Sequence, residues 1–176
     1  MIRPRPNALL CTLALAALCA GCFGPRTPPA PKYTVGHAAA EPDLADLRVN
    51  VRMAPDLRAA TTPLHFQANG TVTPIPGLAY YAPLELAIEA YLRALAQSNG
   101  QTPQRPFPVV VTCFGIDARS GSACVRVCLE QEAKGGLFRS AEASLPLTEP
   151  ATPETLRSQL EACLRESFLR LVRSSR

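Results

Sequence analysis

Cysteine thiols are the groups in this 176-residue sequence with the clearest capacity for chemistry. Three of the seven cysteines stand within the first 22 residues. The other four lie far along the chain, at Cys113, Cys124, Cys128 and Cys163. A thiol can be acylated, can join another thiol in a disulfide, or can bind a metal ion. The spacing of these cysteines and the residues around them bear on which of the three applies.

The four later cysteines predict disulfides in an oxidising compartment, with small buried thiols as the alternative. Cys124 and Cys128 stand about 13 Å apart on an extended strand, beyond the limit of roughly 7 Å for a bridge. A hairpin centred on residues 120–121 would place Cys113 opposite Cys128 and leave Cys124 for Cys163. The other arrangement is Cys113–Cys124 together with Cys128–Cys163. Either one would attach the last helix to the hairpin.

A metal site and a catalytic site are not expected. Cys124 and Cys128 lie on one strand, while His37 and His65 are the only histidines and lie far from them in weakly structured segments. The stretch RSGSAC, residues 119–124, links two strands and therefore lacks the strand-to-helix turn of a nucleophile elbow. No glycine-rich phosphate loop is present. We therefore predict a protein that is not an enzyme and that has no cofactor and no metal ion.

The start of the sequence has the organisation of an export signal that ends at a cysteine. Two arginines precede an apolar segment, residues 8–20, that is shorter than the about 20 residues a membrane-spanning helix needs. Ala20, Gly21 and Cys22 then resemble the end of a bacterial lipobox. We predict that residues 1–21 are a lipoprotein signal peptide and that Cys22 is acylated. Ordinary cleavage, with Cys22 as an incidental thiol, is the alternative.

Residues 22–32 follow as the lipidated cysteine and a tether that holds four prolines, which favours an extended spacer. Phe23 stands where many inner-membrane lipoproteins have Asp, so we expect the outer membrane, with the domain facing the periplasm. The net charge is only +4, and the basic residues are scattered among acidic ones. This pattern excludes a nucleic-acid footprint.

Residues 33–176 are expected to form one domain. Residues 47–53 alternate between apolar and polar side chains, as a half-buried strand does. Asn69-Gly70 is a hairpin-turn dipeptide between two further short strands. Helical spacing of apolar residues begins at Pro83 and ends before Gly100, which predicts the first helix.

Three more strands and a closing helix are predicted in the second half of the domain. Residues 107–117 and 123–132 flank a Gly/Ser turn and should form a long antiparallel hairpin, followed by a third strand over residues 137–147. Thr152 is suited to cap the last helix, and Glu161–Arg165 and Glu166–Arg170 are expected as exposed pairs along it. The predicted fold class is α+β, a mainly antiparallel sheet with two helices packed on one face.

The mature sequence resembles the ABC-type transport auxiliary lipoprotein family, the PqiC-like proteins. The resemblance begins with PKYTVGHAAA after the tether and continues through LRVNVRMAPDLRAATTPLHF and GLAYYAPLELAIEAYLRALA. It extends over VVVTCFGID, the SGS turn and CVRVCLEQE, and closes with TPETLRSQLEACLRESFLRLV. The sequence departs from the family pattern in having Tyr81 where Trp is frequent and in its cysteines.

The resemblance implies an auxiliary component of an intermembrane lipid transport system. Its partners would be the membrane, through the lipid on Cys22, and an MCE-domain protein with an ABC permease and ATPase, and it could form a homo-oligomer. Tyr80 and Tyr81 are candidates for an interface, although both could simply pack over the sheet. The alternative function is a stand-alone envelope structural or assembly lipoprotein, since a fold does not determine a function.

Overall fold

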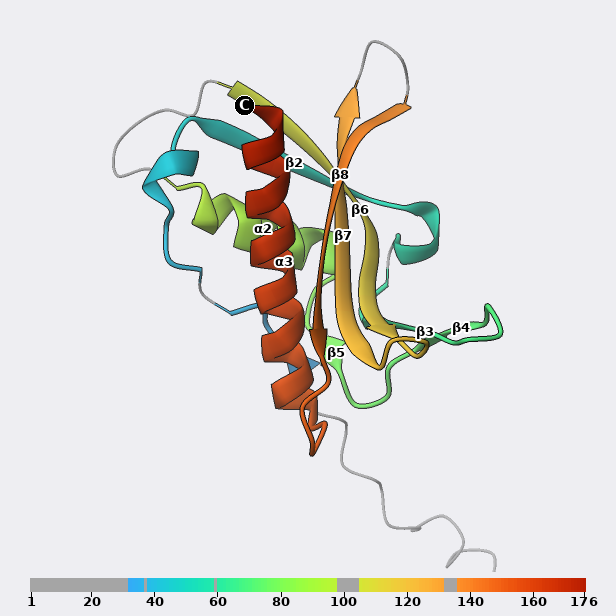
Figure 1. Ribbon diagram of the computed structural model, residues 1–176. Coiled ribbons are helices and arrows are strands. Elements are labelled where there is room, and N and C mark those ends of the chain that lie inside the picture. The colour runs from blue at the N-terminus through green and yellow to red at the C-terminus, as the bar shows by residue number, and fades with distance from the viewer. Residues whose placement is uncertain (1–31, 37, 59, 98–104, 132–135) are drawn as a thin grey trace, which may run out of the picture.

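The computed structural model describes residues 32–36, 38–58, 60–97, 105–131 and 136–176. The predicted signal peptide, Cys22, nearly all of the tether, His37 and Gly100 therefore lie outside the described residues. The described part has an α+β fold, with a mainly antiparallel sheet and both long helices on one face of it (Figure 1). The predicted fold class is confirmed. Among the residues that the structure describes, no helix combines the length and the apolar composition that crossing a membrane requires.

Three long antiparallel strands form the centre of the sheet. They are β6 (Arg105–Asp117), β7 (Ser122–Gln131) and β8 (Gly136–Pro146). The turn between β6 and β7 has Gly121 at φ +60, a left-handed conformation that glycine adopts without strain. Alternate residues of β6 and β7 are buried under the helices, so one face of this meander forms the floor of the core.

Two strands pair with the same edge of β6, one after the other along its length, and both run parallel to it. β2 (Leu47–Met53) pairs with the first half of β6, and β3 (Leu64–Phe66) pairs with its end. β4 (Val72–Pro74) returns antiparallel to β3. The predicted strands are therefore present, but the sheet is mixed, because β2 and β3 both run parallel to β6 while the other strand pairs of the sheet are antiparallel.

The first long helix, α2 (Leu84–Leu95), packs against β2. Its buried residues lie at helical spacing, at Leu84, Ile88, Tyr91, Leu92 and Leu95. Pro83 is the residue before the helix rather than its first residue, a one-residue difference that leaves the proline ring outside the hydrogen-bond ladder.

The closing helix, α3 (Pro153–Ser175), covers β7 and β8. Thr152 caps it as predicted, since its side-chain oxygen accepts a hydrogen bond from the Thr155 amide at 3.2 Å. In the core beneath it, the rings of Phe168 and Phe107 meet edge to face, with centroids 5.8 Å apart. This contact joins the helix to the central strand.

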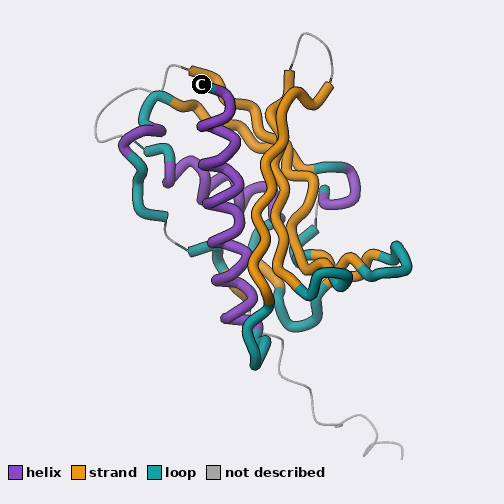
Figure 2. The backbone as a smooth tube through the Cα atoms, in the orientation of Figure 1, coloured by secondary structure: helices purple, strands orange, loops and turns teal. Residues whose placement is uncertain are grey.

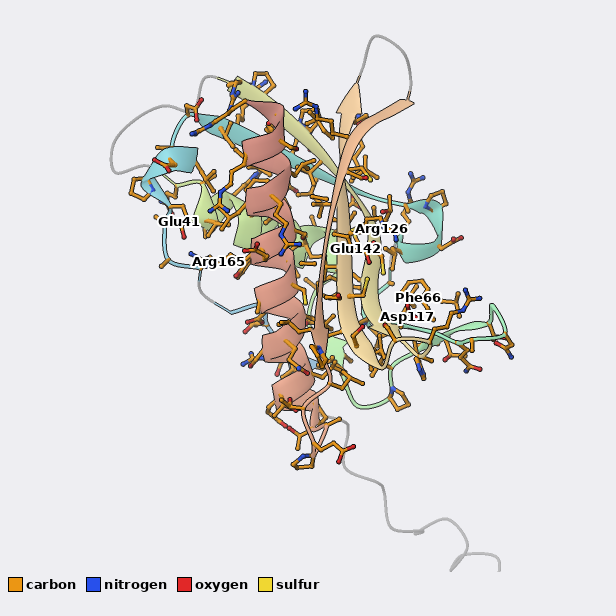
Figure 3. All side chains as sticks on the ribbon, viewed as in Figure 1. Glu41, Phe66, Asp117, Arg126, Glu142 and Arg165 are labelled. Carbon is orange, nitrogen blue, oxygen red and sulfur yellow. The ribbon has the colours of Figure 1, made fainter. Side chains whose placement is uncertain are left out.

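One predicted pair on α3 is present and the other is wrong. Glu166 accepts a hydrogen bond from Arg170 at 2.8 Å, as expected. Arg165 pairs with Glu41 instead of Glu161, because the segment before β2 brings a carboxylate alongside the helix, as Figure 3 shows. Glu161 accepts instead from the backbone amide of residue 36, at 2.8 Å.

A second, two-stranded parallel sheet lies at one end of the domain. It joins β1 (Lys32–Tyr33) to β5 (Ala79–Tyr80), and the Tyr81 amide donates to the Tyr33 carbonyl at 3.0 Å. Figure 2 shows the long strands beside the helices, with the β3–β4 hairpin projecting away from both helices. Two short 3-10 helices, Pro42–Leu44 and Pro55–Leu57, flank β2.

Candidate functional site

An apolar groove of about 400 Å³ lies between the first described residues and the outer side of α2. Residues 33–36 form one wall, and the other consists of Leu86 and the alanines that follow it on α2, at Ala87, Ala90 and Ala94. These positions recur at helical spacing, so the small side chains form a continuous hollow along the helix. The volume is within the range of about 300–1,000 Å³ seen for small-ligand pockets.

The two tyrosines predicted as an interface have different surroundings in this groove. Tyr80 is 1% exposed, whereas Tyr81 is 70% exposed and stands at the rim with Leu86, which is 58% exposed. Neighbouring residues of an extended segment point to opposite sides, which separates the two rings. Tyr81 and Leu86 are therefore the residues that a partner would meet first.

The hydroxyl of Tyr80 is buried and has no hydrogen-bond partner among the described residues. Burial raises the pKa of Tyr80 well above its usual value, and the nearby carboxylate of Glu161 raises it further while Arg157 opposes this. The phenol is therefore neutral at physiological pH. A buried polar group without a partner is uncommon in native structures, and such groups often mark a functional site.

Charged residues of α3 hold the β1 wall of the groove in place. Tyr33 donates a hydrogen bond to Glu154 at 2.8 Å, and the guanidinium of Arg157 stacks over the Tyr33 ring at 5.8 Å. Arg157 also donates to the Thr34 carbonyl at 3.2 Å. The Tyr33 hydroxyl lowers the pKa of Glu154, because it donates to the ionised carboxylate. Side-chain contacts thus position this wall, since β1 is only two residues long.

The four later cysteines have free thiols and lie on two sides of the sheet. Cys163 is buried on α3, with its sulfur 3.6 Å from the Ala123 carbonyl on the helix side of β7. Cys124 and Cys128 occupy the alternate positions of β7, whose side chains point to the other face. A bridge from Cys163 to either residue would have to cross the sheet, so neither predicted partner of Cys163 is supported by the geometry.

The predicted register of the hairpin is also wrong. Val110, not Cys113, lies opposite Cys128, and Cys113 lies opposite Arg126. The chain turns one residue earlier than a hairpin centred on residues 120–121 would require, with Asp117 paired to Ser122, and a bulge then shifts the register further in the same direction. Cys113 approaches Cys124, its partner in the other arrangement that the sequence allowed, with the two sulfur atoms 3.6 Å apart.

The described residues contain no group of three or more histidine, cysteine, aspartate or glutamate side chains that could hold a metal ion. His65 lies in β3, between β4 and β6. On the open face of the sheet, Arg126 and Glu142 point toward each other, as Figure 3 shows, with Nε and Oε2 2.7 Å apart.

Sequence reasoning identified Tyr80 and Tyr81 but not the groove between them and the start of the domain. The groove forms because β1 pairs with β5 across nearly fifty residues of sequence, and two-residue strands carry no periodic signal. The alanines of α2 were visible in the sequence, although small residues on the outer side of a helix are common on ordinary surfaces.

No family model matches the chain, and no curated protein matches it. Solved structures do share its fold. One, an uncharacterized protein, is 15% identical with a TM-score of 0.56 and covers 81% of this chain and 96% of its own. Another, a Xanthomonas campestris protein of the family DUF330, is 13% identical with a TM-score of 0.54 and covers 81% and 92%. DUF330 is the PqiC family, so a protein of the family that the sequence resembles has a similar fold.

Proposed function

We propose that the protein is a lipid-anchored auxiliary subunit of an intermembrane lipid transport system, held at the outer membrane, facing the periplasm and without catalytic activity. The resemblance of the sequence to the auxiliary lipoprotein family supports this function. The fold shared with a DUF330 protein is consistent with it. The observation that carries the proposal is the apolar groove beside the point where the tether enters the domain.

The position of the groove relative to the anchor follows from the length of the tether. Lys32 stands ten positions after Cys22 in the sequence, and Tyr33 already lines the groove. An extended chain covers at most about 3.3–3.6 Å per residue, so acylated Cys22 would keep the groove within about 36 Å of the membrane surface. A subunit that binds a partner protein near the outer membrane would need an apolar surface close to its membrane anchor, as this groove would be.

The composition of the groove suits docking of a protein partner. Tyrosine is enriched in interfaces, and an exposed aromatic ring beside a hollow is a typical anchor for a partner side chain. Tyr81 and Leu86 supply the exposed apolar surface, and the groove between them and Val35 offers space for an apolar side chain. We propose that an MCE-domain protein docks here, within a complex that includes the ABC permease and its ATPase.

Site-specific photo-crosslinking in intact cells tests this function. A photoreactive phenylalanine derivative replaces Tyr81 at the groove or, as the control, Val72, which is 45% exposed on the distant β3–β4 hairpin. The expected result is a crosslink to an MCE-domain protein from position 81 and not from position 72. A crosslink to a second copy of the chain would assign the groove to a homo-oligomer instead, and the absence of any crosslink would favour a stand-alone envelope lipoprotein.

A further inference from the structure

A pair of thiols lies on the face of the sheet that carries no helix in the described part of the chain. The sulfur of Cys113 on β6 is 3.6 Å from the sulfur of Cys124 on β7. Both residues line a hollow of about 310 Å³ between this sheet face and the β3–β4 hairpin. The pair is therefore within reach of a small reagent, and it lies apart from the groove beside α2.

A β-bulge in β6 creates this proximity. Val111 and Phe114 are both fully buried on the helix side, although strict alternation would place two residues three positions apart on opposite faces. The ladder to β7 shifts register between Val111 and Cys113, so that Thr112 and Cys113 both face away from the core. Gly115 lies directly opposite Cys124 and has no side chain, which leaves the space beside Cys124 open for Cys113.

The side chains next to the pair act on the ionisation of Cys124 in opposite directions. The Cys113 thiol donates to the Cys124 sulfur, which lowers the pKa of Cys124. Burial and Glu142, whose Oε1 lies 3.5 Å from the Cys124 sulfur, raise that pKa, and the guanidinium of Arg126 lowers it. Glu142 is held by two contacts to Arg126, at 2.7 and 2.5 Å. A thiolate can therefore form on Cys124 while Cys113 stays protonated.

We propose that Cys113 and Cys124 form the disulfide of this protein and that Cys128 and Cys163 remain thiols. A disulfide bond is about 2.0 Å long, so the two sulfur atoms need to approach by about 1.6 Å, a distance that small side-chain rotations cover. Cys128 has the hydroxyl of Thr112 as its neighbour at 3.8 Å, and Cys163 lies across the sheet. The Cys113–Cys124 pair is thus a modification site, which an oxidant that carries a disulfide would convert from two thiols to a disulfide.

The exchange with such an oxidant balances in two steps. The Cys124 thiolate attacks one sulfur of the oxidant's disulfide, which forms a mixed disulfide and releases the other sulfur as a thiolate that takes up a proton. Cys113 then loses its proton and attacks the Cys124 sulfur, which forms the Cys113–Cys124 bond and releases the second oxidant thiol. Two thiols of the protein are oxidised, and one disulfide of the oxidant is reduced to two thiols.

The test uses the full mature chain in detergent, first reduced and then exposed to oxidised glutathione as the probe. The remaining thiols are alkylated after denaturation, and the peptides are identified by mass spectrometry. The expected result is one linked peptide pair that contains Cys113 and Cys124, with Cys128 and Cys163 alkylated. The proposal would be overturned if all four cysteines were recovered in alkylated form, or if a link involved Cys128 or Cys163.

Two serine variants separate the steps, with a third as the matched control. In Cys113→Ser the first step proceeds but the second cannot, so glutathione should accumulate on Cys124. In Cys124→Ser the raising effect of the Cys124 sulfur on the pKa of Cys113 is removed, but burial still raises that pKa, so Cys113 should react with glutathione more slowly than Cys124 does in Cys113→Ser. Cys128→Ser should form the link at the same rate as the unaltered chain. Since the reaction needs no transport partner, its failure would not bear on the proposed function.

Discussion

Replacement of Tyr80 by Phe should make the protein more stable. The side chain is 1% exposed, and its hydroxyl has no hydrogen-bond partner among the described residues. Burial of an unsatisfied hydroxyl costs about 1–3 kcal/mol, and phenylalanine fills the same space without it. The unfolding free energy of Tyr80→Phe should therefore rise by up to this amount, which corresponds to about 2–4 °C in Tm for each kcal/mol.

The gain should depend on pH in a defined direction. The raised pKa of Tyr80 keeps the folded protein protonated where the unfolded chain, with a tyrosine pKa of about 10, has already ionised. The unaltered protein therefore loses stability as pH rises above about 10, at roughly 1.4 kcal/mol per pH unit for this group. Phenylalanine does not titrate, so the stability difference between variant and parent should widen above that pH.

Urea denaturation at pH 7 and at pH 10.5–11 provides the measurement, and Tyr33→Phe is the matched control. The hydroxyl of Tyr33 is partnered, since it donates to Glu154, so its removal should give no gain. A loss of stability in Tyr80→Phe at pH 7 would show that the hydroxyl has a hydrogen-bond partner in the folded protein, and would contradict this prediction.

Three further substitutions test the fold around the groove and the thiol pair. Phe168→Ala should lower the unfolding free energy by about 3–5 kcal/mol in urea, because a fully buried ring is lost; a loss below 1 kcal/mol would contradict this. Thr152→Ala should lower the unfolding free energy by about 1 kcal/mol through loss of the helix cap, while Thr152→Ser should retain most of the stabilisation that the cap provides. Gly115→Ala should release β3 from the sheet, since the added Cβ would overlap the Leu64 carbonyl oxygen. Amide exchange at residues 64–66 should then accelerate while that of β7 stays slow; unchanged exchange at those amides would refute the clash.

Elements with strong periodicity could be predicted from the sequence. The alternation of residues 47–53 and the helical spacing in α2 gave the buried faces that the structure has, because burial against one neighbouring layer is what those patterns record. The cap at Thr152 was equally local, since it depends on residues three positions apart. Strand direction was not local: β2 lies parallel to β6 because of the path between them, which no residue of β2 encodes.

The candidate site was less predictable because its parts depend on long-range contacts and on a single inserted residue. The turn lies one residue earlier than predicted and so places Cys113 opposite Arg126, and the bulge at Thr112 is one extra residue that leaves no clear mark in an apolar strand. Arg165 was expected to pair along its own helix but meets Glu41, which is 124 residues away in sequence. Tyr80 and Tyr81 were adjacent in the sequence, and only the fold separates the buried ring from the exposed one.

The central claim is that this chain is an anchored subunit of a transport complex, and recovery of the native protein from detergent-solubilised envelopes tests it most directly. Mass spectrometry would identify both the N-terminal peptide and the proteins that co-purify. We expect an acylated Cys22 at the N-terminus and co-recovery of an MCE-domain protein. Recovery of that protein should fall in Tyr81→Ser, a substitution at an exposed position that should change stability by no more than about 0.5 kcal/mol. An unmodified N-terminus, or recovery of the chain without any transport component, would contradict the central claim.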